Sequence, residues 1–324
     1  MLSRSRCSAS ENRLRGCIDA LLTMHRMNHS SGLKARGYYG CPSGDGTARR
    51  GYATQKPFLS DFFDSEGHSS QISFRWANGT HSSGGVNQGL QFGFDFKRTD
   101  NNLEFSGLRL LDSAVEIFQF PLIYTANIPD DAGETEVQVT AVWSPGNITA
   151  HNNDNAFADL IAFSDAIYAY SRFSVTRTTR LPYGMSAVTR AMAQFASTNL
   201  PYSEQIGGGG IGSVRGYDTN TALGSQGMVL SQEIRSPAFS LFGDEGDFRD
   251  QMQLGAFIDY AWLRQPHRIP DTERTEKMLS VGGGVHYLVG RYLDLQLEVG
   301  TQLKAPPGSD DRDTRAAIVA TVSY

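Results

Sequence analysis

The sequence predicts an all-β protein and, within that class, a transmembrane antiparallel β-barrel. Polar and apolar residues alternate over about eleven segments of strand length. The chain has no run of ~18 apolar residues that could cross a bilayer as a helix, and it ends on an alternating segment whose last residue is aromatic. Because side chains along a strand point alternately to its two faces, each such segment has one apolar and one polar face.

The composition is that of a folded chain rich in apolar residues. The 324 residues are 40% hydrophobic and 19% charged, and 34 of them are glycine. Such a chain is too apolar to stay disordered and long enough for one large barrel or two ordinary domains. A soluble all-β protein and a membrane barrel, whose strands hide their apolarity in alternation, both fit these values.

The first 60 residues differ from the rest. Residues 1–50 hold nine Lys or Arg against three acids, about +6, which leaves about −11 on the remaining chain for a net charge of −5. Cys7, Cys17 and Cys41 all lie here, at spacings that match no usual zinc site, so we expect no metal. The apolar stretch 20–24 is too short for the core of a signal peptide. We therefore expect an atypical basic segment over 1–60, disordered or non-homologous, and the barrel over 61–324.

The alternating segments follow one another from about residue 62 to the end of the chain. The pattern is clear in 90–98, where Phe92, Phe94 and Phe96 share one face. It is clearest in 292–303, where leucine and valine oppose Asp, Gln, Glu and Gly. The predicted strands lie near 71–76, 88–98, 114–126, 134–143, 166–180, 185–197, 227–236, 251–263, 278–288, 292–303 and 314–324.

Segment length, aromatic residues and connections favour a membrane barrel over a soluble sandwich. Many segments reach the ~9–11 residues that a tilted strand needs to cross a bilayer. The connections alternate between short (181–184) and long (144–165 and 198–226), as in bacterial outer-membrane barrels. Aromatic residues gather near segment ends, as interfacial girdles require; they are Tyr124, Trp143, Tyr183, Trp262, Tyr287 and Tyr292.

The last segment has one continuous outward face. Ile318, Ala320, Val322 and Tyr324 alternate with residues of the other face, and the chain stops on the aromatic ring. Such an ending resembles the signal that barrel-assembly machinery reads, which would make that machinery a partner. The alternative is simply a last sheet strand.

Two stretches carry a resemblance to a known family. Residues 200–217 read LPYSEQIGGGGIGSVRGY, and 227–237 read GMVLSQEIRSP. Together they resemble the haemolysin secretion/activation family of the ShlB/FhaC/HecB type, the outer-membrane transporters of two-partner secretion. Further matching stretches are 93–105, 142–146, 179–182 and 257–260, so the resemblance runs from about Phe62 to Tyr324.

The resemblance implies an architecture and a site. In that family a sixteen-stranded barrel follows two periplasmic POTRA domains. The loop bearing Val214, Arg215, Gly216 and Tyr217 would fold into the lumen, where its arginine contacts acidic groups of the inner wall. The eleven strands predicted here would be the C-terminal part of such a barrel, in a chain that is incomplete at its amino terminus and lacks the POTRA domains.

Strand periodicity independently places two acids on the inner wall. Apolar residues on one face of 251–263 leave Asp259 on the other face, and the same pattern in 227–235 leaves Glu233 inside. Arginine suits such a site because its planar fork can bind a carboxylate through two hydrogen bonds. We expect Arg215 to pair with Asp259, with Glu233 as the second candidate. The alternative is that Arg215 is a solvated loop residue.

The glycine run of the long loop is a candidate hinge. Gly207, Gly209 and Gly212 formally satisfy G-x-G-x-x-G, but no helix follows, so a dinucleotide site is not expected. Glycines instead permit tight bends and close approach to the wall. The predicted hinge comprises Gly207, Gly208, Gly209, Gly210 and Gly212.

The remaining polar residues predict a channel wall rather than chemistry. The seven histidines are scattered and no nucleophile motif occurs, so we expect no enzyme, no metal and no cofactor. Four carboxylates are interpreted as the wet wall of a channel: Glu134, Glu136, Asp294 and Glu298. Tyr168, Tyr170 and Arg172 share one face, either as a ladder that touches a passing polypeptide or as packing.

The resemblance implies an outer-membrane translocator of a Gram-negative bacterium that secretes and activates a large haemolysin- or adhesin-like partner protein by two-partner (type V) secretion. Its other partners would be outer-membrane lipid and barrel-assembly machinery, and no nucleic acid. The alternatives are a general or ligand-selective porin, an inactive fragment of a transporter, and a soluble β-sandwich enzyme or lectin.

Overall fold

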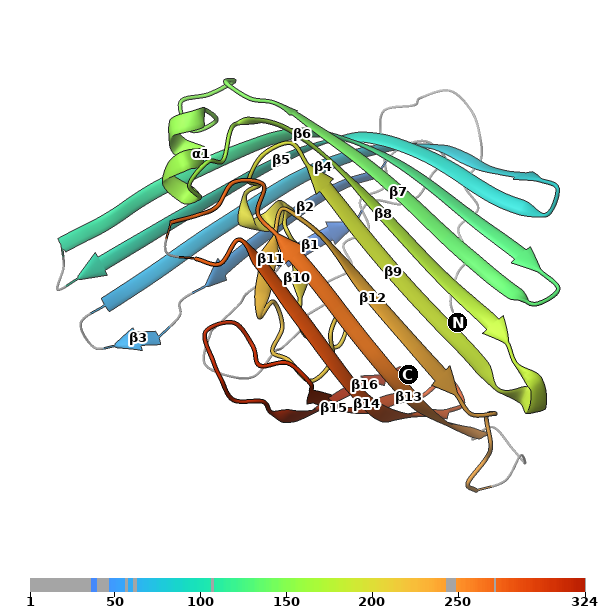
Figure 1. The fold of residues 1–324 in the computed structure, drawn as a ribbon. Coiled ribbons are helices and arrows are strands. Elements are labelled where there is room, and N and C mark those ends of the chain that lie inside the picture. Colours follow the sequence, from blue (N-terminus) through green and yellow to red (C-terminus); the bar gives the residue numbers. More distant parts are fainter. Residues whose placement is uncertain are drawn as a thin grey trace, which may run out of the picture.

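The computed structural model describes residues 36–39, 47–55, 58–60, 63–105, 108–242, 249–270 and 272–323. Within these ranges the chain forms one antiparallel sheet of fourteen strands, a separate two-stranded hairpin and one short helix (Figure 1). The sheet follows chain order from β1 to β16 with no parallel crossover among the described strands. In the same part of the chain, no helix is long and apolar enough to span a membrane.

The described residues form sixteen strands, one α-helix and two 3-10 turns. The elements are β1 (Arg36–Tyr39), β2 (Thr47–Gln55), β3 (Phe58–Ser60), β4 (Phe63–Ser83), β5 (Val86–Phe105), β6 (Leu108–Asp130), β7 (Gly133–Pro145), α1 (Asp154–Leu160), β8 (Ile167–Arg180), β9 (Ser186–Ala196), β10 (Ile206–Gly208), β11 (Ala222–Gly224), β12 (Gln226–Arg235), β13 (Asp250–Arg264), β14 (Thr275–Val289), β15 (Leu293–Gln302) and β16 (Thr314–Val322). Two single 3-10 turns, η1 (Pro182–Gly184) and η2 (Tyr202–Glu204), lie between them.

All eleven segments predicted from alternation are strands of the main sheet, namely β4 to β9 and β12 to β16. Three further strands, β1 to β3, lie within residues 1–60, where no strand was predicted. The sequence of β2, TARRGYATQ, has no apolar face of period two, so its pattern gave no strand signal. Cys7, Cys17, Cys41 and Tyr324 lie outside the described residues.

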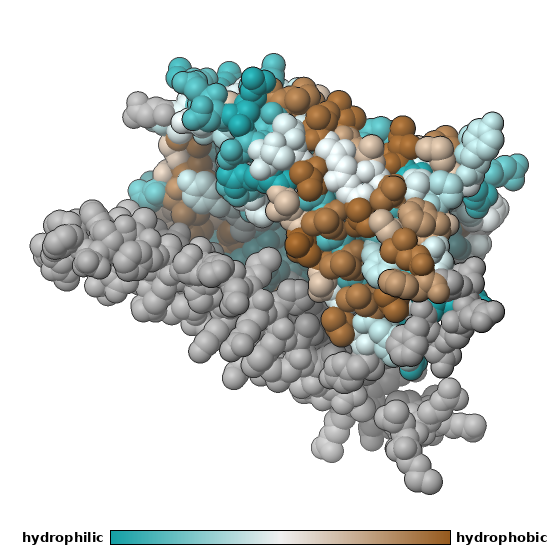
Figure 2. Space-filling model, turned by 90° about the horizontal axis from the view of Figure 1, so that it is seen from below, coloured by the Kyte–Doolittle hydropathy of each residue, from teal (hydrophilic) through white to brown (hydrophobic). Residues whose placement is uncertain are grey.

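The outer face of the curled sheet is apolar. Large side chains such as Phe92, Leu122 and Trp143 are about half exposed, and each belongs to the face opposite the polar residues of its strand. Figure 2 shows apolar residues gathered in a broad band on one side of the molecule. In water an apolar surface of this extent would drive association, whereas hydrocarbon chains cover it without cost. The alternation therefore builds a lipid-facing wall.

The inner face is polar and follows from the register. Ser231 pairs with Asp259, Asp259 with Ser280, and Gly284 with Glu298, so inward residues of neighbouring strands form polar rows. The sheet curls around this face (Figure 1). Among the described residues no ladder joins β1 to β16, so this part of the sheet is open.

Most connections are short at one end of the sheet and long at the other; the exceptions are β5–β6 (106–107), which is short at the long end, and β12–β13 (236–249), which is long at the short end. Short turns join β4 to β5, β6 to β7, β8 to β9 and β14 to β15. In the first of these, Gly84 and Gly85 both have positive φ, as a two-residue hairpin turn of type I′ requires. Long connections at the other end span 146–166, 197–225, 265–274 and 303–313. The prediction of alternating short and long connections is confirmed for these pairs.

Candidate lumen-loop site

The connection between β9 and β12, residues 197–225, folds onto the inner face of the sheet. It contains η2 and a small hairpin in which Ile206 pairs with Gly224 and Gly208 with Ala222. Figure 1 shows β10 and β11 inside the curve of the sheet. We call residues 197–225 the lumen loop. The loop carries Arg215 to a position where three strands, β12, β13 and β15, present carboxylates.

Arg215 binds Asp259 of β13 through a two-pronged contact. Its Nε lies 2.8 Å from Oδ2 of Asp259 and its Nη2 lies 2.9 Å from Oδ1. The backbone N–H of Arg215 also donates to Oδ2, at 3.0 Å. The aspartate is 0% exposed and the arginine 5%. A buried carboxylate is stable here because every contact supplies a donor to a charged acceptor.

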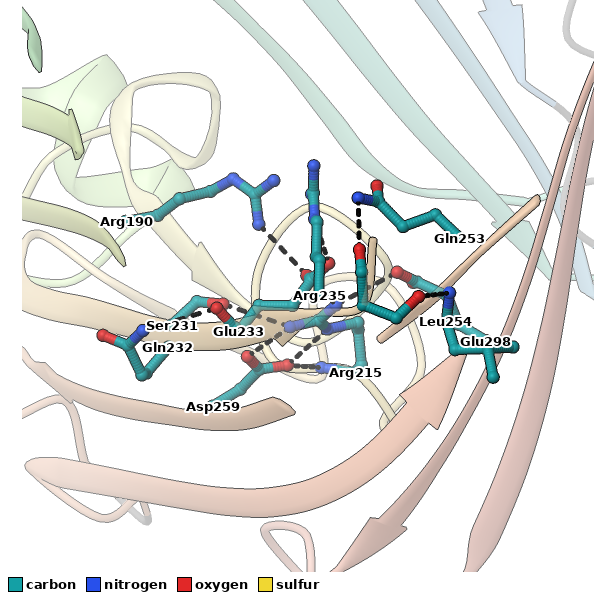
Figure 3. A network of polar contacts seen from close by, with 11 residues as sticks. Arg190, Arg215, Ser231, Gln232, Glu233, Arg235, Gln253, Leu254, Asp259 and Glu298 are labelled. Carbon is teal, nitrogen blue, oxygen red and sulfur yellow. Dashed lines mark hydrogen bonds and ion pairs between the residues drawn. The ribbon is translucent and has the colours of Figure 1, made fainter. Parts of the chain in front are cut away.

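Two more strands complete the arginine's surroundings (Figure 3). Nη1 donates to Glu233 of β12 at 2.8 Å and to Glu298 of β15 at 3.0 Å, and Nη2 donates to Ser231 Oγ at 3.1 Å. A guanidinium has five N–H groups, and with the two Asp259 contacts each of the five has an acceptor. The site is thus matched to arginine; lysine has three donors and no planar fork.

An aromatic ring covers the face of the guanidinium. The Arg215 Cζ atom lies 3.4 Å from the ring centroid of Phe257, an inward residue of β13. The ring needs the space beside Gly282 of β14, since a Cβ there would lie 2.4 Å from Phe257 Cζ. Cation–π attraction adds ~0.5–2 kcal/mol, more in dry surroundings. The wall therefore provides hydrogen-bond acceptors for the edge of the guanidinium and an aromatic ring for its face.

The residues next to Arg215 fix the loop backbone against the wall. Val214 is fully buried in an apolar cluster; the other members are Ile206, Tyr217, Ala222, Val229, Ala261, Leu263 and Met278. The Tyr217 hydroxyl lies 3.0 Å from the Leu279 carbonyl and 2.5 Å from the Lys304 carbonyl, and it accepts from the Leu279 N–H at 3.3 Å. Packing and polar contacts thus act on both sides of the arginine.

Electrostatics keep the arginine charged. Burial alone would lower the pKa of Arg215, but the hydrogen bonds and charge of Asp259, with those of Glu233, outweigh it and place the pKa above its ordinary value. Burial raises the pKa of the Tyr217 phenol. Both loop groups therefore keep their protons at neutral pH, and the contact depends on the carboxylates being ionised.

Some of the residues predicted from the sequence come together at the Arg215 site, and others lie outside it. The structure brings Val214, Arg215, Gly216 and Tyr217 to the wall where Asp259 and Glu233 lie. The terminal residues Ile318, Ala320 and Val322 do not contribute to this site, because they are exposed on the outward face of β16; Ile318 pairs with Leu297, the neighbour of Glu298, on the opposite face of the sheet from the loop.

The predicted hinge glycines divide between a strand and a bend. Gly209 and Gly210 have φ of 102° and 93°, which favours glycine strongly, and they form the bend. Gly207 and Gly208 instead belong to β10, where they pair with Leu223 and Ala222 of β11; a hinge at these two positions stays a prediction. A Cβ on Gly212 would meet nothing within 4 Å.

Three contributors were missed by sequence reasoning. Glu298 was interpreted only as channel wall, and Phe257 and Ser231 were given no role. Each has the inward parity of its strand, so the alternation pattern contained a signal for facing the lumen. That they converge on one loop arginine depends on the curl of the sheet, which no local pattern encodes.

The two tyrosines of β8 are covered by α1 and the lumen loop. Tyr168 and Tyr170 are stacked with ring centroids 6.4 Å apart and are both buried. Phe157 of α1 lies over Tyr168, and the Tyr170 hydroxyl donates to Glu204 of the lumen loop at 2.9 Å. Within the described residues, no group of three or more His, Cys, Asp or Glu could hold a metal ion.

A curled antiparallel sheet with an apolar outer face, a polar inner face and a loop bound inside defines an outer-membrane-type β-barrel protein. Residues 25–287 match the model of the haemolysin secretion/activation protein family ShlB/FhaC/HecB. The chain belongs to this family, which places it in the outer membrane of a Gram-negative bacterium. The match begins at residue 25, whereas the composition led us to expect the family-like part of the chain to begin at residue 61.

Solved structures share the fold at low sequence identity. CdiB from Escherichia coli is 17% identical with a TM-score of 0.69, and 89% of this chain covers 52% of it. CdiB from Acinetobacter baumannii is 16% identical with a TM-score of 0.58, covering 89% of this chain and 50% of that one. BamA from Haemophilus ducreyi lacking POTRA domains 1-3 is 11% identical with a TM-score of 0.55, covering 90% and 64%.

The chain spans about half the length of the two CdiB structures it matches. Comparison with curated proteins found no significant match.

Proposed function

We propose that this chain forms barrel strands of an outer-membrane translocator. The translocator secretes and activates a large haemolysin- or adhesin-like partner protein by two-partner secretion. Family membership supports the class of protein. The observation that carries the proposal is Arg215, whose five donors are all met by residues of the inner wall. A loop held so completely inside a polar lumen is suited to closing it.

The proposed mechanism is gated passage without covalent chemistry. An unfolded polypeptide would move along the inner wall, whose Ser, Thr, Gln and charged side chains can exchange hydrogen bonds with a passing backbone. The lumen loop blocks this route while Arg215 is bound, and passage requires its displacement. Folding of the partner outside the cell would supply the driving force, so the protein needs no nucleotide and is not an enzyme.

Two further partners follow from the surfaces. The apolar outer face is matched to outer-membrane lipid. Strand β16 presents Ile318 and Val322, 68% and 73% exposed, on its outward face. We propose that this strand is the part recognised by barrel-assembly machinery.

The test is a secretion experiment in the host of the gene. Deletion of the gene should remove one large protein from the culture medium, and the wild-type gene should restore it. An Arg215→Ala variant should restore at most a small fraction, while Arg312→Ala, an exposed arginine of the β15–β16 connection, should restore it fully. If the medium is unchanged and only the uptake of small solutes falls, the protein is a porin instead.

A further inference from the structure

A second charged residue of the lumen loop is as deeply buried as Arg215. Glu204, at the end of η2, is 2% exposed. Its Oε1 lies 2.5 Å from Nζ of Lys97 on β5 and accepts from Ser203 Oγ at 2.8 Å, and its Oε2 accepts from the Tyr170 hydroxyl at 2.9 Å. A buried carboxylate with a cation and two hydroxyl donors is fully compensated.

The backbone of Glu204 is held as well. Its carbonyl oxygen accepts from Arg172 Nη2 at 3.2 Å and from Gln194 Nε2 at 2.9 Å. Arg172 and Gln194 are inward residues of β8 and β9, and they bond each other at 2.7 Å. The contact therefore involves a side chain and a peptide group at once, and its partners come from three strands, β5, β8 and β9.

The two charged contacts hold the loop to different parts of the wall. Arg215 binds β12, β13 and β15, whereas Glu204 binds β5, β8 and β9. They share no partner, and their polarity is opposite: a loop cation meets wall anions, and a loop anion meets a wall cation. A third pair, Asp218 with Arg315 of β16, is exposed to solvent and contributes little.

We propose that Glu204 and Lys97 form a second latch of the lumen loop, and that the loop leaves the lumen only when this latch and the Arg215 latch are both broken. The inference rests on the proposed function in one respect, that displacement of the loop opens the route. Glu204 acts as a positioning residue for residues 198–208, as Arg215 does for residues 213–217. A cargo or partner that engages only one side of the barrel then cannot open it.

The test is hydrogen exchange of the whole chain folded in detergent, followed by mass spectrometry. Glu204→Gln and Lys97→Gln should each raise exchange of residues 198–208 about tenfold. The double variant should equal either single one, because the same contact is lost once. Lys97→Arg keeps the charge and should retain protection. Asp159→Asn, an exposed acid of α1, should change nothing.

Residues 213–217 distinguish two latches from one. They should stay protected in Glu204→Gln, and residues 198–208 should stay protected in Arg215→Ala, with both exposed only in the combined variant. Three results would overturn the proposal. They are unchanged exchange of residues 198–208 in Glu204→Gln, additive effects of Glu204→Gln and Lys97→Gln on that exchange, and release of both regions by Arg215→Ala alone. If Glu204→Gln does not fold, the contrast between Lys97→Gln and Lys97→Arg decides alone.

These measurements need neither a secreted partner nor an open pore. The latch can therefore fail while the secretion experiment succeeds, and the reverse outcome is equally recognisable.

Discussion

Gly216 and Gly300 lie backbone to backbone where the lumen loop meets β15. A Cβ on Gly216 would come within 2.8 Å of the carbonyl carbon and oxygen of Gly300, and a Cβ on Gly300 would come within 2.6 Å of the Gly216 nitrogen. Gln302 of the same strand donates to the Gly216 carbonyl at 2.7 Å. The absence of two side chains lets the loop lie directly on the wall, and this sets how far the Arg215 side chain has to reach.

Alanine at Gly216 should release the loop. The residue has φ of 91°, which costs an L-residue ~1–2 kcal/mol, and the new methyl group would push the loop off β15. We expect Gly216→Ala to lower the thermal midpoint in detergent by several degrees and to raise exchange at residues 213–217.

Two variants calibrate that result. Gly300→Ala should have a similar effect, because it fills the same contact from the other side. Gly212→Ala should have almost none, because no atom lies within 4 Å of its Cβ position. Equal effects at 212 and 216 would contradict the close-contact explanation.

The three carboxylates around Arg215 should not be equivalent. Asp259 is fully buried and bonds three N–H groups of Arg215. Removing its charge leaves a buried cation short of compensation, at ~3–5 kcal/mol. Glu233 is slightly exposed and also pairs with Arg235 and Arg190, so its loss should cost only ~1–3 kcal/mol.

Urea unfolding of Asp259→Asn and Glu233→Gln measures this order. The matched control is Glu136→Gln, an exposed inward acid of β7, whose free energy of unfolding should stay within ~0.5 kcal/mol of wild type. A larger loss for Glu233→Gln than for Asp259→Asn would show that the two-pronged contact is not the principal one.

Period-two alternation predicts part of this site, and the rest could not be predicted from any local pattern. The inward parity of Asp259 and Glu233 is a property of their own strands, so residues 251–263 and 227–235 sufficed to predict them. Lys97 and Glu204 are 107 residues apart, and only the curl of the sheet brings them together. The sequence of β2 likewise lacks alternation, and its pairing with β4 is a tertiary result.

The second latch should respond to acid. Burial alone would raise the pKa of Glu204, but the charge and hydrogen bond of Lys97, with Ser203 and Tyr170, outweigh it, so the pKa lies below its ordinary value of 4.5. A carboxyl with a lowered pKa stabilises the folded state above that ordinary value, and the contribution is lost as pH falls through the lowered pKa.

The thermal midpoints of wild type and Glu204→Gln test this dependence. Their difference should be constant from pH 7 to about pH 5 and should shrink below about pH 4.5. Lys97 and Arg172 are the cations that contact Glu204, through its carboxylate and its backbone carbonyl respectively. A difference that is unchanged at pH 3 would mean that the Glu204 charge does not stabilise the loop.

Two separate arginine substitutions on β13, one on each face, can test which face of this strand contacts lipid. Ile258 is 47% exposed on the outward face, whereas Gln253 points inward. An arginine facing lipid near mid-membrane costs ~2–4 kcal/mol, whereas one facing a wet lumen can keep its water. Ile258→Arg should therefore lower the free energy of unfolding in lipid vesicles by that amount, and Gln253→Arg should leave it nearly unchanged. The same pair compared in detergent should show a smaller gap, because a micelle lets the arginine head reach water. Equal losses for both variants in vesicles would place the two faces in similar surroundings and contradict a lipid-facing wall. The expected asymmetry would show that the face carrying Ile258 contacts lipid and that the face carrying Gln253, on which the lumen loop lies, does not.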